Sequence, residues 1–149
     1  CNNMILLYII LLLVNIYIIY SIKEPSNFTA VKEKYSRLRK YISNSDDIEP
    51  KFKPLKNQVI LTGFLKNRND ELGYNINKGG EIGLCLDGTP NEIFHVLIHE
   101  LAHTVSSKYA HDEEFWENEG KIRTMCQQLG LYSPISNKTE FCGSHIRDV

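Results

Sequence analysis

The sequence predicts an α+β domain, with a small three-stranded sheet and two long helices, behind an apolar N-terminal helix. Three features support this prediction. Residues 4–22 carry no charge, residues 57–86 contain three segments typical of short strands, and residues 89–130 contain two amphipathic helical patterns. With 149 residues, 42% of them hydrophobic and 23% charged, the chain has room for one globular domain.

The first segment is long and apolar enough to cross a membrane. Met4 to Ile22 comprises 19 residues, which as a helix reach about 28 Å, close to the ~30 Å of a bilayer's hydrocarbon layer. A cleaved signal peptide is the competing interpretation. Against it, no Lys or Arg precedes the run, and residues 21–25 contain no small-x-small cleavage site. We therefore expect residues 1–22 to be an uncleaved membrane anchor.

The charges after this segment predict which side of the membrane holds the rest of the chain. Residues 23–56 contain nine Lys and Arg against five Asp and Glu, whereas residues 57–149 contain eight against thirteen. By the positive-inside rule the C-terminal part lies on the cytoplasmic side, where the sequons at Asn27 and Asn137 are not used. The acidic balance of residues 57–149 argues against a nucleic-acid partner.

Residues 30–43 show a helical pattern with Lys and Arg on one side. The apolar side consists of Val31, Tyr35, Leu38 and Ile42. This helix either packs on the domain or links it to the membrane, where its basic side could contact anionic headgroups. Ser, Asn, Asp and Pro between residues 43 and 54 indicate a turn-rich connection. We therefore expect a basic juxtamembrane helix and linker over residues 23–56 and a separate domain over residues 57–149.

Three strands should open that domain. The segments are Gln58–Leu65, Gly73–Asn77 and Glu81–Leu86. A polar loop at residues 66–71 separates the first two, and Lys78-Gly79-Gly80 is a hairpin signal between the last two. We expect the last strand to form an edge beside the helix that follows it.

That helix is predicted by its cap and its apolar stripe. Thr89-Pro90-Asn91-Glu92 is a capping box, with Thr89 at the N-cap and Pro90 at the first helical position. Apolar residues then recur at every fourth position, at Ile93, Leu97, Leu101 and Val105.

Within this helix, residues 99–103 read His-Glu-Leu-Ala-His. In a helix, His99 and His103 project from one face a turn apart, so both imidazoles can bind one metal ion. Zinc suits these ligands, and Glu100 lies where a carboxylate can take a proton from the attacking water. The H-E-x-x-H pattern is a metallopeptidase signature, and it predicts one zinc ion per chain in a zincin-like domain.

The third zinc ligand is less clear from the residues. His95 lies in the same helical column but about 12 Å from His103, so we expect it to be a polar neighbour. His111 also follows His103 by eight residues. It can reach the same metal only if the chain turns back, although residues 104–110 contain no Gly or Pro. Three glutamates of the next helix therefore remain rivals of His111: Glu114, Glu117 and Glu119.

A second long helix should begin directly after His111. Asp112 can cap it and Gly130 can end it. Its apolar stripe consists of Phe115, Ile122, Cys126 and Leu129. Asp112 could also accept a hydrogen bond from a zinc-ligating histidine, although capping alone explains it equally well. We expect Phe115 and Trp116 to fix the turn at His111 rather than to contact a substrate.

The cysteines of the domain indicate neither a disulfide framework nor a structural zinc site. Cys85, Cys126 and Cys142 are odd in number and lack C-x-x-C spacing. A Cys126–Cys142 pair is conceivable only in an oxidising compartment. Reduced, buried thiols fit the predicted cytoplasmic side better.

The pattern HELAH, a short spacer and HDEEFW resembles the WLM-type metallopeptidases and their relatives in the SprT/Spartan group. Leu84-Cys85-Leu86 and Phe141-Cys142-Gly143 make the chain similar to short WLM-like proteins of large DNA viruses, which would place it in a host membrane or a virion. The resemblance covers roughly residues 57–145. It implies His99, His103 and His111 as zinc ligands and Glu100 as the catalytic residue, but it supplies no substrate.

These features together predict a membrane-tethered zinc peptidase that acts on a protein or peptide. An extended substrate could add to the edge of the sheet as a further strand. Two alternatives remain open, a zinc-binding module without catalysis and a structural membrane-tethered protein, for example of a virion. The sequence does not predict the oligomeric state.

Overall fold

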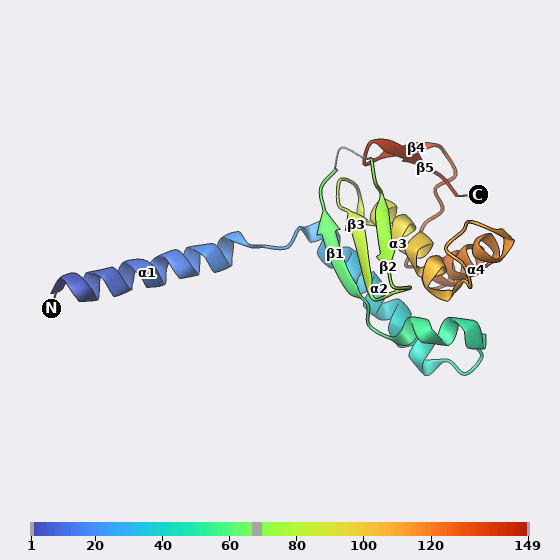
Figure 1. Cartoon of the computed structure of the whole chain (residues 1–149), viewed down its shortest axis with the longest axis horizontal. Coiled ribbons are helices and arrows are strands. Elements are labelled where there is room, and N and C mark those ends of the chain that lie inside the picture. The colour runs from blue at the N-terminus through green and yellow to red at the C-terminus, as the bar shows by residue number, and fades with distance from the viewer. Residues whose placement is uncertain (1, 67–69, 149) are drawn as a thin grey trace.

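The helix that carries the His-Glu-Leu-Ala-His motif runs through the middle of the domain (Figure 1). The computed structural model describes residues 2–66 and 70–148. The motif helix, α3 (Pro90–Val105), begins at the predicted capping box. Thr89 N donates a hydrogen bond to Glu92 Oε2 at 2.7 Å, and the Thr89 hydroxyl accepts one from Glu92 N at 3.3 Å. Of the predicted apolar stripe, Ile93, Leu97 and Leu101 are buried and Val105 is partly buried, so cap and stripe together fix α3 in the core.

Three strands form the sheet against which α3 packs. β1 (Ile60–Phe64) is parallel to β3 (Glu81–Cys85), and β2 (Gly73–Ile76) is antiparallel to β3, which gives the order β1-β3-β2. All three predicted strands are therefore confirmed. The prediction that the last strand forms an edge is wrong, because β3 lies between the other two. The outer strand beside α3 is β2.

α2 (Ser26–Asn44) packs against α3 and contributes to the core. Its buried side includes the four predicted apolar residues together with Phe28. The connection after α2 differs from the prediction of turns: residues Pro50–Lys56 form a 3-10 helix, η1, which buries Phe52 and Leu55. Residues 26–56 thus pack on the domain, and the boundary between residues 56 and 57 stays a prediction.

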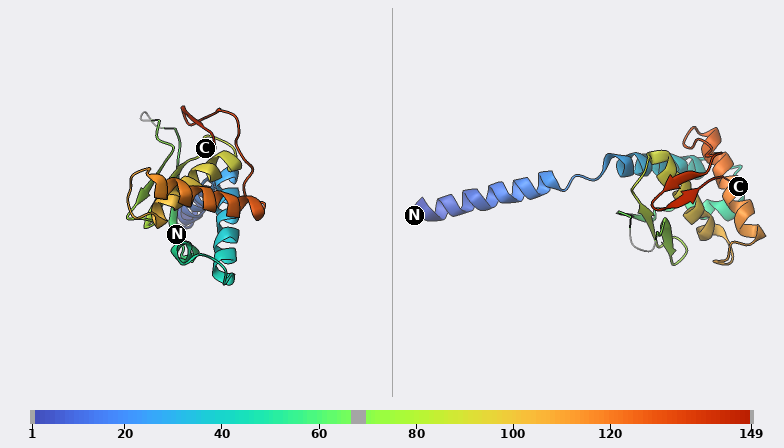
Figure 2. Two further views of the ribbon diagram at one scale, coloured as in Figure 1. Left: turned by 90° about the vertical axis from the view of Figure 1, so that its right-hand side faces the viewer. Right: turned by 90° about the horizontal axis from the view of Figure 1, so that it is seen from above.

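α1 (Asn2–Ser21) projects away from the domain, joined to it by an extended stretch (Figure 2). Its described side chains, from Met4 onward, are all exposed. Residues Met4–Ser21 are long and apolar enough to cross a membrane, a property that a signal sequence would share.

The remaining elements close the domain at the C-terminal end. α4 (Glu113–Gln128) packs against α3, and a short hairpin follows, formed by β4 (Thr139–Phe141) and β5 (Ser144–Ile146). Asp112 caps α4 as predicted, because its carboxylate accepts a hydrogen bond from Phe115 N at 3.1 Å. The sequence gives no strand signal for the hairpin, since each of its strands has only three residues.

A disulfide ties this hairpin to the sheet. The Sγ atoms of Cys85 and Cys142 lie 1.99 Å apart, with Cys85 at the end of β3 and Cys142 at the hairpin turn. Cys126 is free and buried in α4. The expectation of reduced thiols is therefore wrong for Cys85 and Cys142. The pairing could not be read from spacing, because 57 residues separate the two cysteines.

Candidate metal centre

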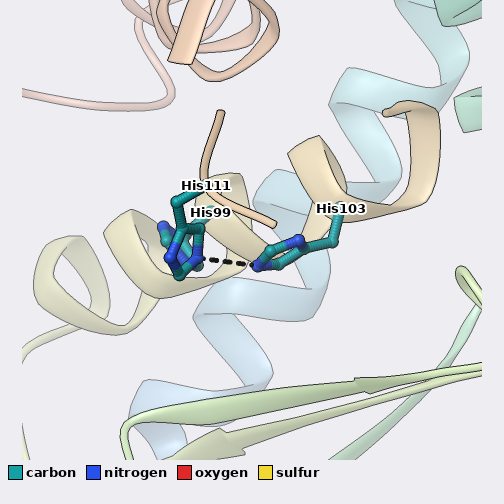
Figure 3. Close-up of side chains that lie close together, drawn as sticks. All are labelled: His99, His103 and His111. Carbon is teal, nitrogen blue, oxygen red and sulfur yellow. Dashed lines mark hydrogen bonds between the residues drawn. The ribbon is translucent and has the colours of Figure 1, made fainter. Parts of the chain in front are cut away.

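Three imidazole rings converge at one point on α3 (Figure 3). His111 Nε2 lies 3.0 Å from His99 Nε2 and 3.1 Å from His103 Nε2. His99 and His103 come from one face of α3, and His111 comes from the segment that precedes α4. Two nitrogen ligands of a tetrahedral zinc ion are themselves about 3.3 Å apart, since each lies about 2.0–2.1 Å from the metal. The spacing of the three nitrogens therefore fits a shared metal ion.

The turn that returns His111 to α3 is held by residues outside it. α3 ends at Val105, where Ser106 adopts an extended conformation and its hydroxyl donates to Ala102 O at 2.8 Å. Lys78, from the turn between β2 and β3, donates to Ser106 O at 2.7 Å and to Ser107 O at 2.6 Å. A lysine at the C-terminus of a helix also interacts favourably with the helix dipole.

Two further contacts hold the segment between α3 and α4. Ser107 donates from its backbone nitrogen to both carboxylate oxygens of Glu114 at 3.2 Å, and its hydroxyl also bonds to that carboxylate. The Tyr109 hydroxyl accepts a hydrogen bond from Lys78 N at 3.1 Å. Lys78 and Glu114 thus set the direction of the chain through hydrogen bonds to the backbone of Ser106 and Ser107.

The ring of Phe115 forms the apolar wall behind all three histidines. It is fully buried, and its centroid lies 4.8 Å from that of His99, 4.4 Å from that of His103 and 4.6 Å from that of His111. Trp116 lies farther away, 5.6 Å from the His111 ring, and is 43% exposed. Phe115 therefore limits how the three rings can move.

Glu119 is the residue that orients His99. Its Oε2 atom lies 3.2 Å from His99 Nδ1, so a proton on Nδ1 leaves the Nε2 lone pair facing the other two histidines. Burial works to raise the pKa of Glu119, but the hydrogen bond from His99 and the charge of Arg123 outweigh it and lower that pKa. Asp112, the candidate that the sequence offered for this role, instead caps α4 through Oδ1, and its Oδ2 atom lies 3.9 Å from Lys108 Nζ.

The other candidate ligands lie outside the cluster. Glu114 binds Ser107, and Glu117 is exposed and pairs with Lys121 at 2.7 Å. Glu119 contacts the far nitrogen of His99. His95 lies 2.9 Å from the Tyr132 hydroxyl, in a separate polar network. Of the predicted site residues, the structure thus brings together His99, Glu100, His103 and His111.

Two of the imidazoles, those of His103 and His111, are available as neutral ligands. Burial, with the neighbouring histidines His99 and His111 acting in the same direction, lowers the pKa of His103 to about 4. Burial and His99 likewise lower the pKa of His111. Because only a neutral imidazole offers a lone pair to a metal, these shifts favour metal binding near neutral pH.

Glu100 lies beside the histidines, and β2 fixes its surroundings. The residue is 6% exposed, and burial raises the pKa of its carboxyl to about 7, with His99 opposing the shift. A Cβ atom on Gly73 would lie 2.7 Å from Val96 Cγ1 and 3.0 Å from Glu100 Oε1. Glycine is therefore needed where β2 passes the carboxylate.

β2 and α3 border a groove of about 280 Å³. It is lined by Gly73, Tyr74, Asn75, His99, Glu100, His103, Tyr109 and His111. Asn75 joins its two walls, since its Nδ2 atom donates to Glu100 O at 2.7 Å and to Thr104 Oγ1 at 3.0 Å. The groove thus presents three imidazoles and one acid of raised pKa to a molecule that lies along β2.

Comparison with known proteins gives two findings. The model of the WLM domain family matches residues 32–144. The fold is similar to the crystal structure of Wss1 from Saccharomyces cerevisiae, with a TM-score of 0.42, 26% sequence identity, and coverage of 67% of this chain and 84% of that chain. Among curated proteins, none matches the sequence. The resemblance to viral proteins stays a prediction.

Proposed function

The chain belongs to the WLM family, a family of metallopeptidases, and on this premise we propose that it is a zinc-dependent peptidase. The single observation that carries the proposal is the convergence of three imidazole nitrogens beside a buried glutamate. A structural histidine cluster would not need an acid of raised pKa at its side, whereas hydrolysis does.

His99, His103 and His111 would hold the zinc ion through their Nε2 atoms. Bound zinc polarises a scissile carbonyl and lowers the pKa of a water molecule toward about 7. The neutral state of His103 and His111 and the orientation of His99 by Glu119 support this ligand set.

Glu100 would act as the general base. Its carboxylate would take a proton from the attacking water and then deliver that proton to the leaving amine. A group that does both is most effective when its pKa is near the working pH, and burial raises the pKa of Glu100 to about 7. Gly73 leaves room for this carboxylate at the floor of the groove.

An extended peptide is the substrate that best fits the groove. β2 is an outer strand of the sheet, and its residues Gly73, Tyr74 and Asn75 line the groove opposite the histidines. A peptide could pair with β2 through backbone hydrogen bonds, which would hold its scissile bond beside Glu100. This contact involves only the backbone of the substrate. It therefore favours extended or unfolded proteins without selecting a sequence.

We further propose that α1 anchors the domain in a membrane. The charge bias of residues 23–56 supports the cytoplasmic side, whereas the Cys85–Cys142 disulfide is typical of an oxidising compartment. The two indications oppose each other, and glycosylation at Asn137 distinguishes between them.

The proposed function is tested by measuring zinc content and cleavage of fluorescently labelled casein by the full chain in detergent. We expect about one zinc per chain, and we expect Glu100→Gln to keep the metal while losing about 10²–10⁴-fold in rate. The matched control is Glu140→Gln, an exposed glutamate on β4. An active Glu100→Gln protein would overturn the mechanism. Zinc without cleavage in the parent would indicate a binding module, and a folded parent without zinc would indicate a structural protein.

A further inference from the structure

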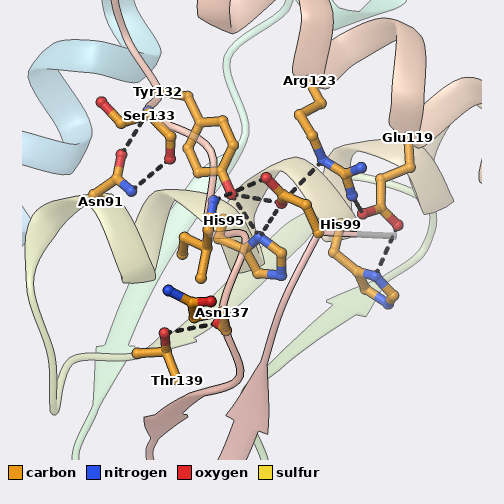
Figure 4. Close-up of polar contacts among 11 residues, drawn as sticks. Asn91, His95, His99, Glu119, Arg123, Tyr132, Ser133, Asn137 and Thr139 are labelled. Carbon is orange, nitrogen blue, oxygen red and sulfur yellow. Dashed lines mark hydrogen bonds and ion pairs between the residues drawn. The ribbon is translucent and has the colours of Figure 1, made fainter.

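A buried polar network joins the C-terminal segment to α3 and α4 (Figure 4). Asp148 is its centre. Its Oδ1 atom accepts a hydrogen bond from the Tyr132 hydroxyl at 2.7 Å, and its Oδ2 atom accepts one from Ile135 N at 2.9 Å. Asp148 Oδ1 also lies 3.2 Å from Arg123 Nε and 3.2 Å from His95 Nδ1. One carboxylate therefore connects three separate parts of the domain.

The network continues from Arg123 to the histidine cluster. Arg123 is paired with the Glu119 carboxylate, one helical turn away on α4. The second oxygen of that carboxylate contacts His99 Nδ1. The side chains of Arg123 and Glu119 are 11% and 3% exposed, so water has little access to this part of the network. A change at Asp148 can thus reach His99 through two buried residues.

Among the residues that the structure describes, the charges of the network leave one negative charge in excess. Two carboxylates, Glu119 and Asp148, share one guanidinium, that of Arg123. Burial lowers the pKa of His95, which keeps that imidazole neutral near pH 7. An uncompensated buried charge is costly. The excess negative charge lies on the Nδ1 side of His99. A cation bound at Nε2, on the other side of the ring, would balance it.

We propose that Asp148 is a positioning residue of the metal centre, which holds Arg123 and thereby fixes the Glu119 carboxylate against His99. Glu119 alone has three rotatable side-chain bonds and could turn away from the histidine. Arg123 lies on the same helix and cannot lock it without a partner from elsewhere. Asp148 supplies that partner, and Tyr132 and Ile135 hold Asp148 in turn. Groups that orient zinc ligands typically change metal affinity by about 10–100-fold.

The proposal rests on the proposed zinc site for its effect on metal affinity, but not for its effect on His99. In the metal-free full chain, labelled with ¹⁵N-histidine, NMR reports which nitrogen of His99 carries the proton. We expect the proton on Nδ1 in the parent and a mixture of tautomers in Asp148→Asn. With Zn²⁺ and a competing chromophoric chelator, we expect Asp148→Asn to bind about tenfold more weakly.

The matched control is Asn91→Ala, which removes two hydrogen bonds between α3 and Ser133 but leaves the contacts of Asp148 in place. It should lower stability while the His99 tautomer and the zinc affinity stay as in the parent. Should Asp148→Asn fail to fold, Arg123→Lys tests the same connection by removing the guanidinium fork. A parent-like His99 tautomer in folded Asp148→Asn, or equal effects of Asp148→Asn and Asn91→Ala, would overturn the proposal. Failure of the parent to bind zinc would instead contradict the proposed function.

Discussion

The Nε2 atoms of His103 and His111 lie 3.1 Å apart although eight residues separate them in the chain. A continuous helix would hold these residues about 12 Å apart along its axis. The helix must therefore end between them, and Ser106 is the residue at which it does.

His111→Ala should remove one of three ligands and weaken zinc binding by more than about a hundredfold. This effect exceeds the usual effect of changing a residue that only orients a ligand. Zinc per chain after dialysis, measured by atomic absorption, tests this. Glu117→Gln is the control, because Glu117 is exposed and pairs with Lys121. Equal zinc in the parent and in His111→Ala would assign the third ligand to another residue.

Lys78→Met should loosen the segment that returns His111 to the cluster. The ammonium of Lys78 donates to the carbonyls of Ser106 and Ser107, and hydrogen bonds from a charged group contribute about 1.5–3 kcal/mol. We expect a loss of that order in unfolding free energy, measured by urea titration, together with weaker zinc binding. Lys108→Met is the control, since the Lys108 side chain lies in the same segment but is 73% exposed. Similar losses in both variants would contradict the role of Lys78.

The contrast between α3 and the turn after it explains how far the sequence could predict this site. The cap and stripe of α3 are local patterns, and they placed His99, Glu100 and His103 on one helix. The turn after His103 depends on Lys78, which is distant in sequence, so no pattern within residues 104–110 reveals it.

Other features escaped prediction for the same reason. The central position of β3, the pairing of Cys85 with Cys142 and the contact of Glu119 with His99 all depend on which distant segments meet. Glu119 did carry a signal, as an acidic residue on the helix after His111. That signal indicated a rival ligand, because spacing alone does not reveal which nitrogen of a histidine a carboxylate will contact.

Gly73→Ala should displace the Glu100 carboxylate while leaving the histidines in place. The new Cβ would lie 3.0 Å from Glu100 Oε1 and 2.7 Å from Val96 Cγ1, which is closer than such atoms normally approach. Misplacing a catalytic group by about 1 Å can cost about 10²-fold in rate. We expect kcat for casein cleavage to fall toward that extent with zinc content unchanged.

Gly120→Ala is the matched control for this substitution, because a Cβ at Gly120 on α4 meets nothing within 4 Å among the described residues. It should leave kcat unchanged. A parent-like kcat in Gly73→Ala would show that β2 and Glu100 have more room than the structure indicates.

The Cys85–Cys142 disulfide should stabilise the domain substantially. It closes a loop of 57 residues, and constraining a loop of that size in the unfolded chain contributes about 4 kcal/mol in the chain-entropy estimate. We expect Cys85→Ala/Cys142→Ala to lose stability of this order in urea, and dithiothreitol to destabilise the parent but not the double variant. Equal effects of the reductant on both proteins would show that the parent lacks the bond.

Glycosylation at Asn137 reports the side of the membrane on which the domain lies. Asn137 is exposed, whereas the amide of the other sequon, Asn27, donates to Leu86 O and Gly88 O and is held in the fold. From the charge bias of residues 23–56 we expect no glycan on Asn137 when the full chain is translated with microsomes. Residues 23–149 fused behind a cleavable signal peptide are the positive control, and this protein should gain an endoglycosidase-sensitive glycan.

A glycan on Asn137 in the unfused chain would contradict the cytoplasmic orientation and agree with the disulfide. Its absence would mean that Cys85 and Cys142 are oxidised on the reducing side of the membrane. The burial of both residues bears on that outcome, because they are 0% and 3% exposed. Thiol–disulfide exchange requires a thiolate to reach a sulfur atom, so a buried bond, once formed, is shielded from cellular thiols.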